Sequence, residues 1–439
     1  MTDMNYLEEK SRQVPVVADA DVIVSGGGPA GVCAAIAAAR RGARTVLLER
    51  GGCLGGTWTA GALGWIIDSA GKNGLLAEII EELASMGCVP ASPSRRSSVP
   101  FDPEGMKLVL ETLCSRANVR IRLHTLVADV VKDGAGELKA VVTESKSGRE
   151  AWRGKVFIDA TGDGDLGALS GCRYAVGNPN GQIQPMSLLA LVTGVDPTDA
   201  AAYVMNYSPR EQAIEALRTD LLAEGVEPSY HDTSLFHLGG ELYFLMANHQ
   251  YGGKGTDADD VTRATLEARR EIHRQVETLR RRGGVWEKIQ LAATAEHIGV
   301  REGRRIKGLY EVSLEDLKSG ARHADAVCRS TFCVDVHALD ASTGGIEVPP
   351  CAVKPYDIPL RALISADVPN LMMAGRCISG DFYAHASYRV TGNAAVLGEA
   401  AGVCATIAAK AGKQPRDAAS DVFFSQFGTM VNQQEGVLL

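Results

Sequence analysis

The sequence predicts an α/β fold in which both ends of the chain build one parallel sheet and an α+β segment is inserted between them. Three observations support this fold class. A glycine-rich turn, DVIVSGGGPAG at residues 21–31, joins a buried strand to a helix; similar strand and helix patterns return near Pro369; and the region between contains no second turn of this type. Strands that alternate with helices favour a parallel sheet, here of Rossmann-like architecture.

The glycines of the first turn stand in the register G-x-G-x-x-G. Residues 22–24 suit a strand buried on both faces, and the alanine-rich stretch 32–41 favours a helix. In this setting Gly26 permits the tight turn, Gly28 lets a pyrophosphate approach the backbone, and Gly31 lets helix and strand pack closely. We expect the pyrophosphate of a dinucleotide to bind at Gly26, Gly28, Pro29, Ala30 and Gly31.

A second strand, residues 45–48, ends in an acidic residue that can bind the other part of a nucleotide. Glu49 stands eighteen positions after Gly31, and its carboxylate can accept hydrogen bonds from both ribose hydroxyls of an adenosine. Two glycine pairs follow at once in GGCLGG, residues 51–56, which indicates another close approach of backbone to ligand. We expect the ligand to be longer than one nucleotide and to contact Glu49, Arg50, Gly55, Gly56 and Thr57.

Periodicity and propensity place the remaining elements. The expected helices cover residues 75–86, 103–117, 259–282 and 392–409, and the expected strands cover 119–124, 126–131, 138–143, 156–160, 187–195, 242–246 and 370–376. The simplest domain organisation is a discontinuous nucleotide-binding domain, an inserted substrate or cap domain, and a C-terminal tail. Their predicted boundaries are 14–184 with 346–415, 185–345, and 416–439.

Length and composition narrow the class of protein. At 439 residues the chain is long for one core, and a formal charge of −8 argues against a nucleic-acid partner. Ten scattered cysteines without C-x-x-C or Cys/His spacing indicate reduced thiols and no metal site. The N-terminus is polar, and the longest apolar stretch, 393–409, is interrupted by Glu399 and predicts a buried helix. We expect a cytoplasmic protein without membrane insertion, either monomeric or a homo-oligomer.

In combination, several motifs resemble the FAD-dependent oxidoreductase family of GGGPAG proteins in the glutathione-reductase-like superfamily. The similarity extends over nearly the whole chain. It is carried by QVPVV at 13–17, GGGPAG at 26–31, GGCLGG at 51–56, ATGDGD at 160–165, QPMSL at 184–188, IGVREGRRI at 298–306 and NLMMAGR at 370–376. The resemblance implies a Rossmann-like FAD-binding domain and FAD as the cofactor.

The resemblance also implies roles for individual residues. Glu49 would hold the adenosine ribose, residues 26–31 the pyrophosphate, and the GGCLGG turn would run beside the ribityl chain. Val127 would meet the adenine through its backbone. The residues expected near the rest of the dinucleotide and the flavin are Thr161, Gly162, Asp163, Gly375, Arg376, Gly392, Asn393 and Ala394.

A covalent flavin is a weaker alternative. Cys53 and Cys377 lie in turns next to the expected cofactor, and a thioether bond is chemically feasible. Buried thiols in small-residue turns usually fill space. We therefore expect FAD to be bound non-covalently.

The candidate catalytic residues follow the Arg376 turn. His385 has a side chain that titrates near neutrality, and Arg389 stands four residues later, on the same face if the stretch is helical. The segment AHASYRV, 384–390, is several residues shorter than the pattern T-H-V-A-x-G-x-x-R-V of relatives, which puts an inherited role of this pair in doubt.

Each candidate also has a structural interpretation. His385 is either an acid or base beside the flavin or a packed core histidine. Arg389 either clamps a substrate carboxylate or ties down a loop, and Tyr388 either donates a proton or packs in the pocket wall. Arg301, Arg304 and Arg305 pose the same question, and the neighbouring Glu302 favours a structural ion pair.

These observations lead to one main functional hypothesis and two rivals. The main hypothesis is a dehydrogenase or oxidase that transfers a hydride between a small organic substrate and flavin N5. The enzymatic rival is a monooxygenase that uses NAD(P)H and O2. The other rival is a non-catalytic or electron-transfer flavoprotein, which the lack of ferredoxin-like cysteine spacing disfavours.

Overall fold

The computed structural model describes residues 7–90, 97–347 and 350–418, and its centre is a parallel sheet. This sheet has five strands in the order β19-β10-β2-β3-β6. Every neighbouring pair in it is parallel. The strands are β2 (Val22–Ser25), β3 (Thr45–Leu48), β6 (Arg120–Arg122), β10 (Val156–Asp159) and β19 (Leu371–Met373). The expected α/β class with a parallel sheet built from both ends of the chain is confirmed.

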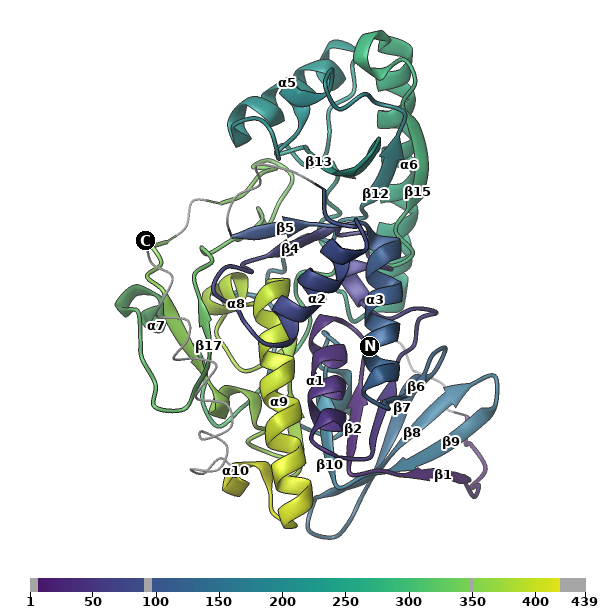
Figure 1. Cartoon of the computed structure of the whole chain (residues 1–439), viewed down its shortest axis with the longest axis vertical. Helices are drawn as coiled ribbons and strands as arrows, with labels where there is room; N and C mark the ends of the chain where they lie inside the picture. The colour runs from purple at the N-terminus through teal and green to yellow at the C-terminus, as the bar shows by residue number, and fades with distance from the viewer. Residues whose placement is uncertain (1–6, 91–96, 348–349, 419–439) are drawn as a thin grey trace.

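Helices from the two ends of the chain cross closely over this sheet (Figure 1). They are α1 (Pro29–Arg40) and α9 (Thr391–Ala411). A Cβ atom on Gly398 or Gly402 of α9 would overlap the carbonyl oxygen of Ala30 or Ala34. Glycine is therefore required at both crossing points, because any side chain would push the helices apart.

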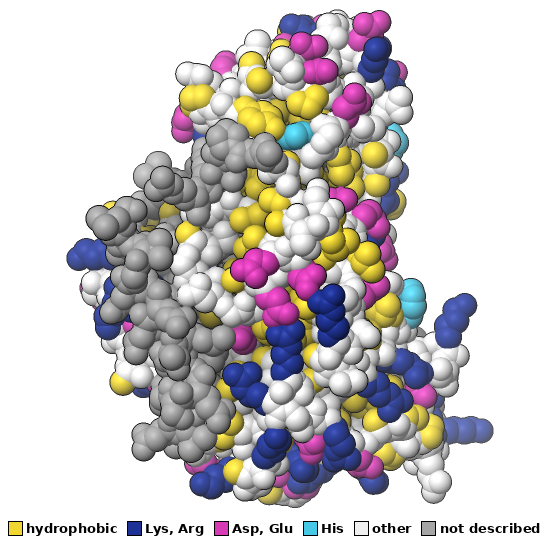
Figure 2. All heavy atoms as spheres, viewed as in Figure 1, with side chains coloured by type: hydrophobic (Ala, Val, Ile, Leu, Met, Phe, Trp, Pro, Cys, Tyr) yellow, Lys and Arg dark blue, Asp and Glu magenta, His cyan; other side chains and the backbone are white. Residues whose placement is uncertain are grey.

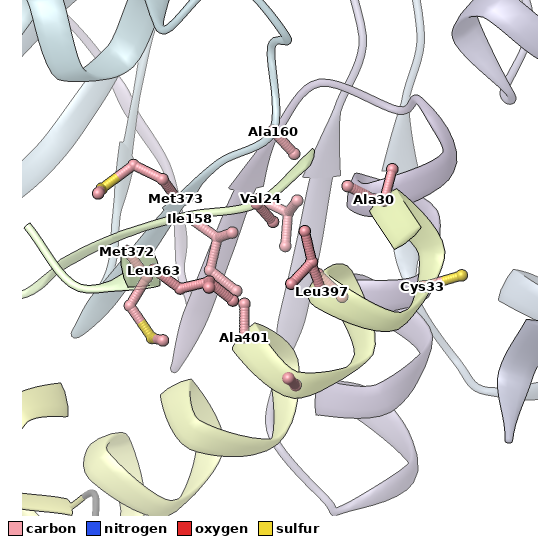
Figure 3. Close-up of a cluster of buried hydrophobic side chains, with 14 of the residues drawn as sticks. Val24, Ala30, Cys33, Ile158, Ala160, Leu363, Met372, Met373, Leu397 and Ala401 are labelled. Carbon is pink, nitrogen blue, oxygen red and sulfur yellow. The ribbon is translucent and has the colours of Figure 1, made fainter. Parts of the chain in front are cut away.

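The side chains beneath this crossing form one apolar core (Figure 3). Val24 and Ile158 extend from β2 and β10 toward Leu397 and Ala401 of α9. All four are completely buried. Although α9 is long and apolar enough to cross a membrane, 83% of its apolar window is buried inside the protein. Its apolarity is thus explained by packing, as the sequence predicted.

Two further helices, α2 (Leu75–Ser85) and α3 (Pro103–Arg116), lie beside α1. Arg40 of α1 pairs with Glu78 of α2 at 2.6 Å, and Arg116 of α3 pairs with Glu82 at 2.5 Å. On this side of the molecule basic side chains gather over the lower part of the surface, interspersed with acidic ones (Figure 2). Exposed pairs of this kind add little stability.

A second sheet, of order β1-β9-β8-β7, flanks the parallel one. Its strands are β1 (Val16–Asp19), β7 (Leu126–Lys132), β8 (Leu138–Ser145) and β9 (Gly148–Arg153). Trp152 is completely buried, and its indole N–H donates to the Thr143 hydroxyl at 2.9 Å.

The middle of the chain forms a separate antiparallel sheet, of order β13-β14-β12-β15, above the parallel one in Figure 1. Its strands are β12 (Ala190–Thr193), β13 (Ser234–Gly239), β14 (Leu242–Met246) and β15 (Gln290–Thr294), with helices α5 (Arg210–Ala223) and α6 (Ala258–Arg282). In α6 the Asp257 carboxylate accepts from the N–H groups of Asp259 and Asp260, and the last turn carries three arginines. This charge pattern complements the helix dipole.

The antiparallel sheet has a core of its own. It joins Ala62 and Trp65 to side chains between Met186 and Ile298. Buried side chains from Ile306 to Val336, which the sequence analysis placed in the inserted segment, belong instead to the first core. The second core therefore reaches only to about residue 300, and the predicted boundary at 345 stays a prediction.

Short elements complete the described chain. They are β4 (Trp65–Ile67) with β5 (Ser98–Pro100), β11 (Tyr174–Ala175) with β16 (Arg305–Ile306), β17 (Ala326–Ser330) with β18 (Tyr356–Pro359), and helices α4 (Asp165–Leu169), α7 (Leu314–Ser319), α8 (Phe382–Tyr388) and α10 (Pro415–Ala418). The expected strand 187–195 is shortened to β12, and Ser187 forms only an isolated bridge with Gly299. All of the expected tail except 416–418 lies outside the described residues.

Candidate functional site

A cavity opens where the strands of the parallel sheet end. The residue that follows each of four strands lines it: Gly26 after β2, Glu49 after β3, Ala160 after β10 and Ala374 after β19. The carboxyl ends of parallel strands are where open α/β sheets bind their ligands. The topology alone thus gives this cavity a functional position.

Most residues expected to bind the cofactor line this cavity. They are Gly26, Gly28, Pro29, Ala30, Glu49, Arg50, Gly56, Thr57, Thr161, Gly162, Asp163, Gly375, Arg376 and Ala394, and Arg389 joins them. The lining also includes residues that the sequence analysis did not assign to it: Gly61, Ala160, His297, Ile298, Gly299, Val300, Ala374 and Thr391. Residues 297–300 come from the far end of the middle unit, and the resemblance had identified 298–306 only as a motif.

The three glycines of the first turn have different surroundings. Gly26 has φ +97°, and a Cβ there would press on the carbonyl of Ala160; a Cβ on Gly31 would overlap the carbonyl oxygen of Gly26. At Gly28, by contrast, φ is −70° and a Cβ would meet no protein atom within 4 Å. Gly28 therefore leaves open space on the cavity wall that protein packing does not require, which fits a pyrophosphate at this position.

The carboxylate of Glu49 is fixed by backbone. Its Oε2 accepts from the Gly27 N–H and its Oε1 from the Gly51 N–H, both at 2.6 Å, and the residue is 9% exposed. These two bonds orient the carboxylate and leave lone pairs on both oxygens. The arrangement fits a carboxylate that receives ribose hydroxyls from the cavity.

Replacing Glu49 by alanine is expected to weaken FAD retention by roughly 1–3 kcal/mol, because ribose hydroxyls lose a charged acceptor. The same change leaves the N–H groups of Gly27 and Gly51 unpaired, so the apoprotein should also lose stability. FAD titration of the apoprotein, together with its thermal midpoint, separates the two effects. Unchanged FAD affinity would contradict the ribose assignment.

Arg376 carries an unpaired donor into this part of the site. Its Nη2 donates to the Asp163 carboxylate at 2.6 Å, while its Nε is buried and has no partner in the described part of the chain. Burial lowers the pKa of Arg376, but the Asp163 carboxylate outweighs this and the net shift is upward. The guanidinium also lies directly against Gly162, which has φ +81°. An anionic or carbonyl-bearing ligand would satisfy the unpaired Nε.

The start of α9 faces the same cavity through Thr391 and Ala394. This helix has no side-chain N-cap, so the N–H groups of its first turn and its positive dipole end are free to act on a ligand. Gly392 and Asn393, which were expected in the wall, do not line the cavity. A Cβ on Gly392 would overlap the Asp68 carbonyl, and the Asn393 amide donates to the Ser330 hydroxyl at 3.0 Å. Both therefore serve packing.

Three other expected residues also lie outside the cavity wall. Gly31 packs helix against strand, as described above, and Gly55 has φ +105°, where a Cβ would overlap the Thr59 side chain. Val127 pairs with Thr143 within the flanking sheet. The loop before Val127 is hydrogen-bonded to the residue expected to bind the ribose, because the Thr125 N–H donates to the Glu49 carbonyl at 2.9 Å. A backbone contact of Val127 with adenine stays a prediction.

The structure does not bring His385 or Tyr388 to the cavity wall. Both are completely buried on α8, and the Tyr388 hydroxyl donates to the Ile378 carbonyl at 2.9 Å. The ring nitrogens of His385 make no regular hydrogen bond within the described residues. Burial and the charges of nearby arginines lower the pKa of His385 well below its ordinary value. At neutral pH this side chain is an uncharged, packed imidazole, so its expected border position is corrected and its catalytic role stays a prediction.

Arg389 does reach the cavity, and it leads to a polar chain that the sequence did not reveal. Its Nη2 donates to the Asp335 carbonyl at 2.7 Å and lies 3.4 Å from the Asp335 carboxylate. That carboxylate is 3.3 Å from His337 Nε2, and His337 Nδ1 is 3.0 Å from His249 Nε2. His249 Nδ1 is in turn 3.2 Å from the Tyr251 hydroxyl.

The carboxylate sets the direction of the hydrogen bonds from Asp335 through His337 to His249. Because Asp335 only accepts, His337 Nε2 carries a proton and its Nδ1 accepts from His249 Nε2. His249 Nδ1 is then an acceptor. The Tyr251 hydroxyl that faces it donates to the Ser229 carbonyl at 3.2 Å. Burial and the charge of Arg301 lower the pKa of His337 to about 4 and that of His249 further. Both histidines are therefore neutral at pH 7, and the Asp335 carboxylate is the group that favours the protonated form of His337.

No sequence motif predicts this series of hydrogen-bonded polar side chains. His249 and His337 stand 88 positions apart and outside every motif, and only the fold brings them together. The one available hint was Arg389, which the sequence analysis did single out.

Cysteines and metals add nothing to the site. All ten cysteines are free, and burial raises the pKa of Cys377 well above its ordinary value, which keeps it a poor nucleophile. Cys53 is partly buried, with its sulfur 3.7 Å from the Thr59 hydroxyl. Within the described ranges, no group of three or more His, Cys, Asp or Glu side chains is arranged to hold a metal ion.

Comparison with known proteins gives one family match. The profile of the family described as "FAD dependent oxidoreductase" matches residues 21–426. No curated protein matches.

Solved structures show only distant likeness. A geranylgeranyl bacteriochlorophyll reductase-like protein from Thermoplasma acidophilum is 14% identical, with a TM-score of 0.49 over 95% of this chain and 84% of that one. p-Nitrophenol 4-monooxygenase PnpA from Pseudomonas putida DLL-E4 is 11% identical, with a TM-score of 0.45 over 95% and 88%. The flavin-dependent brominase Bmp2 is 12% identical, with a TM-score of 0.46 over 95% and 84%.

Proposed function

The chain belongs to the FAD dependent oxidoreductase family, and we propose that it transfers a hydride between a small organic substrate and N5 of FAD bound in the described cavity. The observation that supports this proposal is that the polar chain is hydrogen-bonded to a residue of the cavity wall. Arg389 lines the cavity and donates a hydrogen bond to Asp335. Asp335 is the first member of the polar chain, which continues through His337 to His249. A site that places proton acceptors next to a flavin suits substrate oxidation.

The wall residues fit FAD as its ligand. Gly28 leaves space for the pyrophosphate, Glu49 receives the ribose, and Arg376 offers its unpaired Nε. When bound, FAD supplies a two-electron acceptor for hydride. The free first turn of α9 would stabilise the negative charge that a hydride brings.

The polar chain would take the proton that the substrate loses together with its hydride. For an alcohol, the Tyr251 hydroxyl would turn from the Ser229 carbonyl to His249 Nδ1 and give up its proton there, while the substrate O–H proton passes to the Tyr251 oxygen. The His249 Nε2 proton then moves to His337 Nδ1, and Asp335 stabilises the resulting imidazolium. The substrate thus becomes a carbonyl compound and its proton stays on the polar chain, while FAD, when bound, would supply the acceptor for the hydride.

A monooxygenase remains the alternative function, and it predicts a different reductant. Such an enzyme would consume NAD(P)H and O2, and NAD(P)H rather than the organic substrate would reduce its flavin. A steady NAD(P)H oxidation by the purified protein would favour it, whereas no oxidation above background is expected for the proposed dehydrogenase or oxidase. An electron-transfer flavoprotein predicts neither activity.

Purified protein should carry about one FAD per chain, yellow and released by acid. This expectation follows from the unreactive state of Cys377 and from the non-covalent fit of the wall. Acid precipitation followed by absorbance of the supernatant checks it. Colour that stays with the precipitate would show a covalent bond and direct attention to Cys53 or Cys377.

The remaining expectations are part of the same proposal. The middle unit, residues 185 to about 300, would act as the substrate-binding cap, because its own core and residues 297–300 border the cavity. A cytoplasmic location, a small-molecule substrate without nucleic-acid or membrane partners, and a monomer or homo-oligomer stay predictions.

A further inference from the structure

Asp335, the first residue of the polar chain, lies beside two arginines, Arg301 and Arg389. Arg301 and Arg389 lie close together, since Nη1 of Arg389 is 3.4 Å from the Arg301 carbonyl. Burial and the charge of Arg389 lower the pKa of Arg301 to about 10. Asp335 is the acidic side chain that faces both. Glu302, which pairs with Arg305, also acts on Arg389, and the nearby Arg210 pairs with Asp232.

Arg301 also keeps free donors. Its Nη1 donates to the Pro185 carbonyl at 2.7 Å and to the Ser187 hydroxyl at 2.9 Å. Among the described residues, its Nε and Nη2 have no hydrogen-bond partner, and neither atom is closed off from solvent. A partly exposed guanidinium held by one nitrogen presents its remaining N–H groups to a ligand.

A buried tyrosine offers a further donor at the same place. Tyr230 is only 2% exposed, and its ring packs against that of His249 in a tilted arrangement, with centroids 4.1 Å apart. Its hydroxyl has no protein partner in the described chain and still reaches solvent, and it lies in the field of Arg301. A hydroxyl that has no protein partner and reaches solvent is free to donate to a ligand at this place.

We propose that Arg301, Tyr230 and Arg389 form an anion-binding subsite that holds the carboxylate of the substrate, so that the substrate class is a small organic acid. This inference rests on the proposed function and deepens it. The carboxylate would accept from the two free nitrogens of Arg301 and from the Tyr230 hydroxyl. The reacting carbon would then lie between the Tyr251 end of the polar chain and the cofactor cavity.

Anion binding would also prepare the polar chain for its reaction. The groups that face His337 are Arg301, Arg389, Asp335, His249 and Tyr230. The two arginines hold its pKa down, and a bound carboxylate would screen them and raise that pKa toward the ordinary histidine range. The base would thus become effective when substrate is present.

The test is calorimetric titration of the yellow holoenzyme with acetate, succinate and benzoate, with benzyl alcohol as the neutral counterpart of benzoate. At least one carboxylate should bind, and benzyl alcohol should not. Arg301→Gln should weaken that binding about 10- to 100-fold, and Tyr230→Phe, which keeps the packed ring, about 3- to 10-fold. Arg269→Gln, which removes an arginine bonded to the Thr294 hydroxyl in the middle unit, is the control and should bind like wild type.

If Arg301→Gln does not fold, Arg301→Lys keeps the charge but loses the planar donor pair, and it should bind at least several-fold more weakly. A holoenzyme that keeps its FAD but binds no carboxylate, or binds one equally well after Arg301→Gln and Tyr230→Phe, would overturn the subsite and leave the FAD proposal standing. A chain that purifies without flavin and cannot take it up would overturn the FAD proposal, and the same titration would still decide the subsite.

Discussion

Replacing Gly28 by valine should abolish most FAD binding while the protein still folds. The residue has φ −70°, which valine adopts without strain, and a Cβ there meets no protein atom within 4 Å. The side chain would instead occupy the space assigned to the pyrophosphate. Forcing the extra methyl groups and the pyrophosphate into one space costs up to about 3 kcal/mol, which corresponds to a roughly 150-fold loss of FAD affinity. Titration of apoprotein with FAD measures it.

Gly134→Val is the matched control for this experiment. Gly134 likewise has no atom within 4 Å of a built Cβ and no positive φ, but it lies in the turn between β7 and β8, away from the cavity. It should bind FAD like wild type. If Gly28→Val bound FAD normally, the pyrophosphate would lie elsewhere.

Replacing His249 by asparagine should slow flavin reduction by substrate roughly 10²–10⁴-fold and leave FAD bound. Asparagine is close to the imidazole in size, but it cannot accept a proton at one nitrogen and release another. His337 and Asp335 would then be cut off from Tyr251. Stopped-flow anaerobic reduction gives the rate, and the flavin absorbance of the purified variant reports cofactor retention.

His385→Asn provides the comparison, because His385 is equally buried but does not line the cavity. If the polar chain carries the proton, this variant should reduce its flavin at close to the wild-type rate; if His385 is the acid or base, it should be slowed roughly 10²–10⁴-fold. A slow His385→Asn protein together with a fast His249→Asn protein would restore His385 as the acid or base and remove the polar chain from the mechanism.

The pH dependence has a defined sign. The neutral chain is the form that accepts a proton, so kcat/KM should be constant at high pH and should fall as the pH drops through the pKa of the chain in the free enzyme. With the pKa of His337 at about 4, no inflection is expected between pH 6 and 8. A midpoint near 6.5 in wild type would identify a histidine in an ordinary environment instead.

The sequence predicted the parts of this molecule that depend on local chemistry. The turn from Gly26 to Gly31 and the strand end at Glu49 were identified because each glycine and the carboxylate has a role fixed by spacing. The small residues of α9 predicted a buried helix. They are small because α9 packs closely against α1 at Gly398 and Gly402. Such features are encoded within a few dozen residues.

The rest depends on contacts that spacing does not encode. His249 and His337 are brought together by the way the middle unit lies over the parallel sheet, and neither stands in a motif. His385 was favoured because it precedes α9, but the short α8 turns its side chain into the core. Residues 306–336 lack a distinctive pattern, so the sequence did not show that their buried side chains belong to the first core.

Anaerobic mixing of the yellow protein with small organic acids that carry an oxidisable hydroxyl or amino group tests the central claim most directly. The flavin absorbance near 450 nm, a wavelength typical of oxidised flavins, should be lost with at least one such acid and no NAD(P)H present. The neutral analogue, in which an amide replaces the carboxylate, should reduce the flavin far more slowly. Bleaching by NAD(P)H alone, with every organic acid inert, would contradict the account and favour the monooxygenase.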